Sequence, residues 1–342
     1  MPAVPSGKVL VSGANGFVAT WVIKTLLEQG YSVRGTVRSQ SKIPHLLKVF
    51  GSYRDKVEFV VVDDMTRAGA FDEHVKDVDA IEHTASPVHF MFEDPNEYIR
   101  PAVQGTVHIL ESALKYGSKV KRVVVTASVA CVVTLGLPEL RTFTENDWNE
   151  GSIKEVEEKG KAAHPMHKYC TSKTLAEKAA WEFVEKHQKE IEWDLVTIMP
   201  PHIFGPVIHE VHEPSALNAS MDGWYRHVLK EVGREEPHTN QGGSWVDVRD
   251  VAEAHVLSLQ NEAAGGNRFI VNSGLYKGRD FINIAHSLDP SVPKLEADDT
   301  GYKAENVMYD STKSKEVLGL RYRTMEETTK DILDDFKAKG WF

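Results

Sequence analysis

The chain has 342 residues, of which 50 are acidic and 40 basic, so its formal net charge is −10 at neutral pH. An acidic protein of this kind is not expected to have the basic face that nucleic-acid binding needs. No apolar run reaches the roughly 18 residues of a membrane span. The first residues also lack the pattern of a secretory signal. The two cysteines lack the C-x-x-C spacing of a zinc site. We therefore expect a cytoplasmic globular protein with no nucleic-acid partner, no membrane segment and no metal.

The first predicted element is a buried strand over residues 8–12, which leads into a glycine-rich turn and then a helix. In such a unit the first glycine permits a tight turn and the second lets the backbone approach a pyrophosphate. The helix N-terminus then offers N–H groups to the phosphates. The sequence therefore predicts a dinucleotide site, with cofactor contacts from Gly13, Asn15, Gly16, Phe17 and Val18.

The second predicted strand, over residues 31–37, is followed by basic residues. Enzymes that prefer NAD(H) usually carry an acidic residue near the end of this strand, about twenty residues past the glycines, to bind the ribose 2′-hydroxyl. No acidic residue occurs between Gln29 and Arg54. Arg38 can clamp a 2′-phosphate through two N–H groups and Lys42 can add a point charge, so we expect NADP(H) as the cofactor.

The third predicted strand, over residues 57–62, ends at Asp63, Asp64 and Met65. A carboxylate at the tip of this strand can accept a hydrogen bond from an adenine amino group. Because side chains alternate along a strand, one of the two aspartates should face away, and we expect Asp64 to face the cofactor together with Met65.

Further strands are predicted over residues 79–83 and 121–126, with a helix over 96–116 between them. Alternating strands and helices predict an α/β fold of Rossmann type, with a doubly wound parallel sheet. Ligands bind at the carboxyl ends of such strands. Ala85 and Ser86 follow the fourth strand, and Thr126 and Ser128 follow the fifth, so we expect these residues at the site.

A predicted helix over residues 166–189 carries the pair Tyr169 and Lys173. Four residues are about one helical turn, so both side chains share one face. A lysine cation there can lower the pKa of the phenol and make it a usable proton donor. The spacing alone arises by chance in many helices. Together with the glycine turn and Ser128, it predicts a catalytic set of Ser128, Tyr169 and Lys173.

The C-terminal third is rich in loops. We expect residues 1–200 to form the dinucleotide-binding core, with 242–272 returning to it. Residues 201–241 and 273–324 should form a smaller substrate-binding lobe, and 325–342 a C-terminal helix. His209 and His212 are spaced as a metal-binding pair, but no third ligand is evident.

In chain order these motifs resemble the extended short-chain dehydrogenases/reductases, and within them the fungal methylglyoxal reductases and ketoreductases, which are related to plant dihydroflavonol reductases. The likeness spans nearly the whole chain and includes Trp245-Val246-Asp247-Val248-Arg249-Asp250. The resemblance implies an NADPH-dependent reductase of ketones or aldehydes in which Tyr169 donates the proton, Ser128 binds the carbonyl oxygen, and Lys173 binds the nicotinamide ribose and tunes Tyr169. It also implies that the segment containing Pro200 and Ile203 cradles the nicotinamide.

Two alternatives stay open beside this interpretation. The first is a nucleotide-sugar epimerase or dehydratase of the same fold. Dehydratases generally have Thr-Asp-Glu or Thr-Glu-Glu after the fifth strand, whereas Thr126-Ala127-Ser128 has no carboxylate. A non-catalytic NADP-sensing regulator usually lacks the Tyr/Lys pair. The natural substrate and the stereochemical preference are not readable, and a homodimer through the two long helices is conceivable. Apolar residues expected in the substrate pocket, for which core packing is an equally good account, are Pro87, Val88, Phe90, Val129, Met166, Ile203 and Trp224.

Overall fold

A computed structural model describes residues 3–86, 93–230, 242–294 and 307–342 of the chain. Pro87, Val88 and Phe90, which we expected in the substrate pocket, lie outside the described residues. None of the described helices combines the length and the apolarity that a membrane span requires.

The centre of the fold is a sheet of seven parallel strands in the order β10-β7-β5-β4-β1-β2-β3. The order reverses at β1, between β4 and β2, which is the topological switch point where doubly wound sheets bind their ligands. The predicted Rossmann-type α/β fold is therefore confirmed. The strands are β1 (Lys8–Ser12), β2 (Ser32–Val37), β3 (Val57–Val61), β4 (Ala80–His83), β5 (Arg122–Thr126), β7 (Asp194–Met199) and β10 (Asn267–Ile270).

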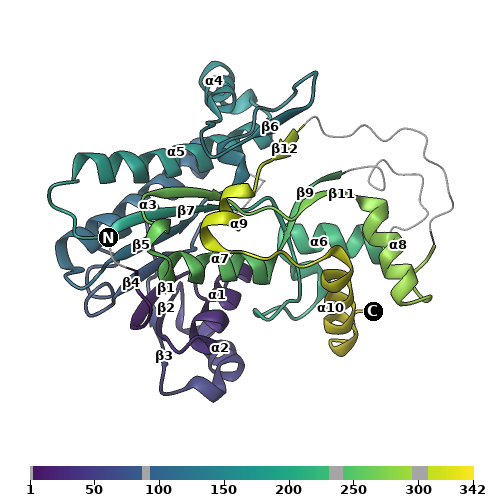
Figure 1. Cartoon of the computed structure of the whole chain (residues 1–342), viewed down its shortest axis with the longest axis horizontal. Coiled ribbons are helices and arrows are strands. Elements are labelled where there is room, and N and C mark those ends of the chain that lie inside the picture. Colours follow the sequence, from purple (N-terminus) through teal and green to yellow (C-terminus); the bar gives the residue numbers. More distant parts are fainter. Residues whose placement is uncertain (1–2, 87–92, 231–241, 295–306) are drawn as a thin grey trace.

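Helices cover both faces of this sheet (Figure 1). On one face lie α1 (Phe17–Glu28), α2 (Ile43–Val49) and α7 (Val248–Gln260), and on the other α3 (Asn96–Tyr116) and α5 (Pro165–Lys186), with the short α4 (Glu150–Lys159) beside α5. Alternation along β1 explains the two layers. Val9 and Val11 are buried in the core with α1 and α7, whereas Leu10 is buried in the core with α3 and α5. The strands are apolar on both sides, as a parallel sheet covered by helices requires.

A second body lies beyond the end of the sheet (Figure 1). Its three-stranded sheet pairs β9 (Gly242–Asp247) with β8 (His202–Phe204) and β11 (Gly274–Lys277). The helices α6 (Ala219–Tyr225), α8 (Gly278–Leu288) and α10 (Met325–Ala338) pack on it. The core of this body is aromatic, with Trp224, Trp245, Phe281 and Phe336 fully or nearly fully buried.

The division of the chain between the two bodies differs from our expectation at two places. Residues 242–247 were expected in the dinucleotide core, but β9 belongs to the second sheet because Trp245 packs edge-on against Phe281, with 5.5 Å between ring centroids. Conversely, α9 (Thr312–Leu318) falls inside the expected lobe 273–324, yet Leu318 is buried in the core with α1 and α7. A two-stranded sheet joins β6 (Arg141–Phe143) to β12 (Val307–Tyr309).

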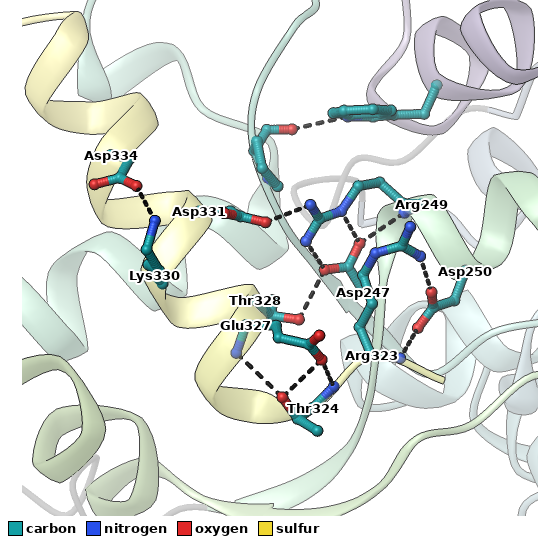
Figure 2. Close-up of polar contacts among 12 residues, drawn as sticks. Asp247, Arg249, Asp250, Arg323, Thr324, Glu327, Thr328, Lys330, Asp331 and Asp334 are labelled. Carbon is teal, nitrogen blue, oxygen red and sulfur yellow. Dashed lines mark hydrogen bonds and ion pairs between the residues drawn. The ribbon is translucent and has the colours of Figure 1, made fainter. Parts of the chain in front are cut away.

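The C-terminal helix α10 is fastened to the junction of β9 and α7 by charged and hydroxyl groups (Figure 2). Buried Asp247 accepts hydrogen bonds from Arg249 and from Thr328 of α10 at 2.7 Å, and Arg249 also pairs with Asp331. Just before α10, Arg323 pairs with Asp250. These contacts place the second body against the carboxyl end of the seven-stranded sheet.

Candidate active site

The turn between β1 and α1 has the geometry that a phosphate-binding turn needs. Gly13 adopts φ 67°, in the left-handed region, and a Cβ there would lie 3.1 Å from the Cα of Ala85. Backbone hydrogen bonds fix the turn: Ala14 N–H donates to Thr36 O at 2.8 Å, and Gly16 N–H to Gly13 O at 2.9 Å. Helix α1 begins directly after Gly16, so its N-terminal N–H groups point toward the carboxyl ends of the strands.

A cavity of about 860 Å³ runs along the carboxyl ends of β1, β2, β3 and β4. Its size suits a dinucleotide, since small-molecule and cofactor sites occupy roughly 300–1,000 Å³. Thr36, Val62 and Thr84 also line it and were not foreseen, because each stands one residue from the strand ends on which we relied. Glu97 lines it from the first turn of α3. Of the residues expected to bind the cofactor, the cavity is lined by Gly13, Asn15, Gly16, Arg38, Lys42, Asp64, Met65, Ala85 and Ser86.

One end of the cavity is exposed and charged. Arg38 is exposed and lines the wall, and Lys42 beside it pairs with Glu210 at 3.0 Å. Asp64 is also exposed, and hydrogen bonds from Thr66 hold the pKa of its carboxyl below the ordinary value. Both aspartates line the cavity, and Asp63 also pairs with Arg67 at 3.2 Å, so the choice of Asp64 for the adenine stays a prediction. Strand β3 ends at Val61, so strand alternation no longer governs the pair.

Next to the part of the cavity lined by Ala85 and Ser86 lies a buried region with the expected catalytic set, whose three residues do not line the cavity itself. Ser128 caps the short turn after β5, where its Oγ accepts from Ala130 N–H at 3.1 Å and contacts Pro200 O at 3.5 Å. The hydroxyl of Tyr169 is hydrogen-bonded to Ser128. From the same helix face, Lys173 Nζ donates to Ser86 Oγ at 2.8 Å and lies 6.0 Å from the centre of the Tyr169 ring. The structure therefore brings together residues from the ends of β4 and β5 and one face of α5.

The electrostatics of this end differ from our expectation. Burial raises the pKa of Tyr169 above its ordinary value, with the Ser128 hydrogen bond opposing the rise, and burial lowers the pKa of Lys173. The expected lowering of the Tyr169 pKa by Lys173 is therefore wrong for the chain by itself. The reason is that the Lys173 ammonium is directed to Ser86 and the phenol to Ser128, while the loss of hydration penalises the charged form of each.

Sequence reasoning missed a hydrogen-bonded pair behind the glycine turn. Ser12 Oγ lies 2.9 Å from His83 Nδ1 and accepts from Ala85 N–H at 3.0 Å. Burial, with a smaller contribution from Lys173, lowers the pKa of His83 to about 4. The two side chains meet because Ser12 and His83 are register partners that end β1 and β4. Polar residues ending neighbouring strands are the signal that could have found them.

Several other expected residues do not line the main cavity. Thr126 and Lys173 line a smaller, adjoining cavity of about 20 Å³ that shares Ala85 and Ser86 with it. Trp224 is 3% exposed and packs against Phe281 and Phe336. The expectation that it lines the substrate pocket is therefore wrong, because the aromatic core of the second body buries it. Residues that pack in or against the hydrophobic cores are Phe17, Val18, Val129 and Ile203, while Met166 is exposed at the start of α5.

A doubly wound sheet, a glycine turn and a long cavity over the switch point define a dinucleotide-binding protein of Rossmann type. The chain belongs to the NAD dependent epimerase/dehydratase family, whose model matches residues 9–274.

Similar proteins include fungal reductases that align with this chain over nearly their whole length. The NADPH-dependent methylglyoxal reductase GRE2 of Saccharomyces cerevisiae is 33% identical over 339 residues, covering 94% of this chain and 96% of that protein. The ketoreductase azaE of Aspergillus niger is 34% identical over 343 residues, covering 95% and 96%. The crystal structure of yeast methylglyoxal/isovaleraldehyde reductase Gre2 complexed with NADPH matches with a TM-score of 0.88 and 32% identity, over 98% of this chain and 100% of that one. The expected family resemblance is confirmed.

A UDP-glucose 4-epimerase of Bifidobacterium longum also matches, with a TM-score of 0.71 but 16% identity over 98% of this chain and 99% of that one. At that identity the likeness concerns the fold alone.

Proposed function

We propose that the protein is an NADPH-dependent carbonyl reductase that converts a small ketone or aldehyde into an alcohol. The observation that carries the proposal is the meeting of Ser128, Tyr169 and Lys173 beside a cavity whose wall includes Ser86, the hydrogen-bond partner of Lys173, as well as Arg38 and Lys42. The names of the similar reductases, which specify NADPH, methylglyoxal and ketoreduction, support the same activity.

The residues along the cavity suit the parts of NADP(H) in order. The turn from Gly13 to Gly16 would hold the pyrophosphate through backbone N–H groups. Arg38 and Lys42 would bind the 2′-phosphate, since a guanidinium matches phosphate geometry and an ammonium adds charge. Asp64 with Met65 would contact the adenine.

The nicotinamide half would extend toward the buried end. Ser86 and Lys173, already hydrogen-bonded to each other, would bind its ribose, and the segment with Pro200 and Ile203 would flank the ring. Thr126 would border the same region, since it lines the small adjoining cavity. The bound cofactor supplies a hydride to the carbonyl carbon.

The protein's own groups complete the reaction at the carbonyl oxygen. As the carbon gains hydride, negative charge develops on oxygen, and the hydroxyls of Ser128 and Tyr169 are placed to stabilise it by hydrogen bonding. Tyr169 then transfers its proton to that oxygen, which gives the alcohol. Because burial raises the pKa of Tyr169, the phenol is protonated at neutral pH and ready to donate.

The second body, with β8, β9, β11 and α6, would form the substrate-binding lobe over this end. Val129, Met166 and Ile203 are the described residues that we propose for the pocket wall. The cytoplasmic location and the homodimer expected from the sequence stay predictions.

A spectrophotometric assay that follows NADPH absorbance against a panel of ketones and aldehydes tests the proposal. A reductase oxidises NADPH with at least one of them and forms the alcohol. The two alternatives give other results: a sensing regulator shows binding without turnover, and an epimerase or dehydratase acts only when a sugar nucleotide is supplied.

A further inference from the structure

The segment 206–210, which follows β8, crosses the cofactor-binding core beside the cavity, and its first residues are fixed there. Pro206 O accepts a hydrogen bond from Trp21 Nε1 of α1 at 2.8 Å. Val207 is buried, and its N–H donates to Asp335 of α10 at 3.0 Å. The segment is therefore tied at once to the helix of the phosphate-binding turn and to the C-terminal helix.

The next two residues extend these ties toward the end of β2. Ile208 O lies 3.1 Å from His45 Nε2, on the helix that follows Lys42. The buried ring of His209 packs on Phe17, the first residue of α1, with 5.4 Å between ring centroids. Since each contact anchors a different point, the backbone of the segment has little freedom to shift relative to α1 and α2.

Glu210 is the next residue, and it faces one of the two cations at the charged end of the cavity. Its carboxylate lies 3.0 Å from Lys42 Nζ, and the side chain is 21% exposed while that of Lys42 is 45% exposed. The hydrogen bond from Lys42 holds the pKa of Glu210 below its ordinary value, so the carboxylate is charged at neutral pH. Lys42 itself lines the cavity next to Arg38.

We propose that Glu210 is a specificity-determining residue, whose fixed carboxylate competes with the ribose 2′-phosphate of NADP(H) for the ammonium of Lys42. The inference rests on the proposed placement of that phosphate at Arg38 and Lys42. The lysine has a flexible stem and can turn toward a phosphate, whereas the chain just before Glu210 is anchored and keeps the carboxylate beside Lys42. A bound 2′-phosphate must therefore draw the ammonium away from the carboxylate, and the weakened ion pair lowers the affinity for the phosphate. NAD(H) carries no such group, so Glu210 lowers affinity for the phosphorylated cofactor only.

Calorimetric titration of the whole protein with NADP⁺ and with NAD⁺ tests this without relying on turnover. Glu210→Gln should tighten NADP⁺ binding about two- to fivefold, the range of an exposed ion pair, and leave NAD⁺ unchanged. Glu213→Gln is the matched control, because it makes the same charge change in an exposed side chain of the same loop. Weaker NADP⁺ binding by Glu210→Gln would overturn the proposal, as would an equal gain from both variants.

A second pair of variants separates this inference from the proposed function. In a Lys42→Ala background, Glu210→Gln should lose most of its effect, since the competition acts through the ammonium; an undiminished effect would overturn the ion-pair mechanism. Arg38→Ala reports on the phosphate position itself. If Arg38→Ala and Lys42→Ala weaken NADP⁺ while Glu210→Gln changes nothing, only the inference fails. If none of the three alters NADP⁺ relative to NAD⁺, the proposed phosphate site fails.

Discussion

The two ends of the proposed cofactor site differ in how their charged groups are held. At the phosphate end Arg38, Lys42 and Asp64 are exposed to water, which screens their interactions. At the catalytic end Lys173 is 8% exposed and His83 2%, and each has a specific hydrogen-bond partner. Changes at the buried end should therefore alter rate and stability, while changes at the exposed end should alter the choice of cofactor. The predictions below test that contrast, from the largest expected effect to the smallest.

Replacing Tyr169 tests the catalytic end most directly. Tyr169→Phe removes the proposed proton donor and keeps the ring, and general acid catalysis is worth on the order of 10² to 10⁴ in rate. We expect a loss of that size in kcat, with unchanged NADPH binding measured by fluorescence titration. Glu182→Gln, at an exposed site on the same helix, serves as the control. A loss in kcat below about tenfold in a folded variant would remove Tyr169 from the mechanism.

Replacing Arg38 tests the phosphate end. A charge-assisted hydrogen bond contributes roughly 1.5 to 3 kcal/mol, which corresponds to about ten- to a hundredfold in affinity. Arg38→Ala should weaken NADPH binding by that factor and spare NADH, and Lys42→Ala should do the same more weakly. Arg54→Ala removes the same charge from an exposed position outside the cavity and should change neither. The ratio of kcat/KM for the two cofactors is the measurement, and equal losses with both would contradict the assignment.

Stability should depend on pH through two buried histidines. Burial lowers the pKa of both His83 and His209 to about 4, against 6.5 for an unburied histidine. The unfolded chain takes up protons below pH 6.5 and the folded protein resists them, so the stabilisation present above that pH is lost as pH falls toward 4. At about pH 5 each histidine should cost roughly 2 kcal/mol of unfolding free energy.

Urea unfolding at about pH 7 and pH 5 measures this loss. His83→Asn should remove its share of the pH dependence, because the variant has no imidazole at that buried site to take up a proton. Identical pH dependence in the wild type and in His83→Asn would contradict a buried, neutral His83.

The smallest expected effect concerns the phenol of Tyr169, which should not ionise near neutral pH. Because burial raises the pKa of Tyr169, its phenol should stay protonated from neutrality to about pH 10, the ordinary value for tyrosine. The ultraviolet absorbance of tyrosinate, taken as wild type minus Tyr169→Phe, should therefore show no ionisation in that range. A difference signal with a midpoint clearly below 10 would mean that Lys173 controls the phenol after all.

Local patterns in the sequence predicted most of the fold and the family membership. The glycine turn, the alternation of strands and helices, and the Tyr169 and Lys173 spacing each depend on residues close together in the chain, and the sheet, the expected helix over 96–116 and the family membership were confirmed. Strand ends predicted most of the cavity wall as well, because parallel strands deliver their carboxyl ends to one edge.

Contacts between residues far apart in the sequence decided the features of the site that the sequence did not predict. The pKa of Tyr169 depends on how far the folded protein excludes water from the phenol. Trp224 packs in an aromatic core whose other members are distant in sequence, so the residues around Trp224 do not predict it. Lys42 and Glu210 are 168 residues apart, and Ser12 and His83 are 71 apart. The sequence by itself determined which groups the protein has and which strand ends present them. Only the tertiary structure decided which of those groups lose their water and which charges meet, because both depend on contacts that no local pattern encodes.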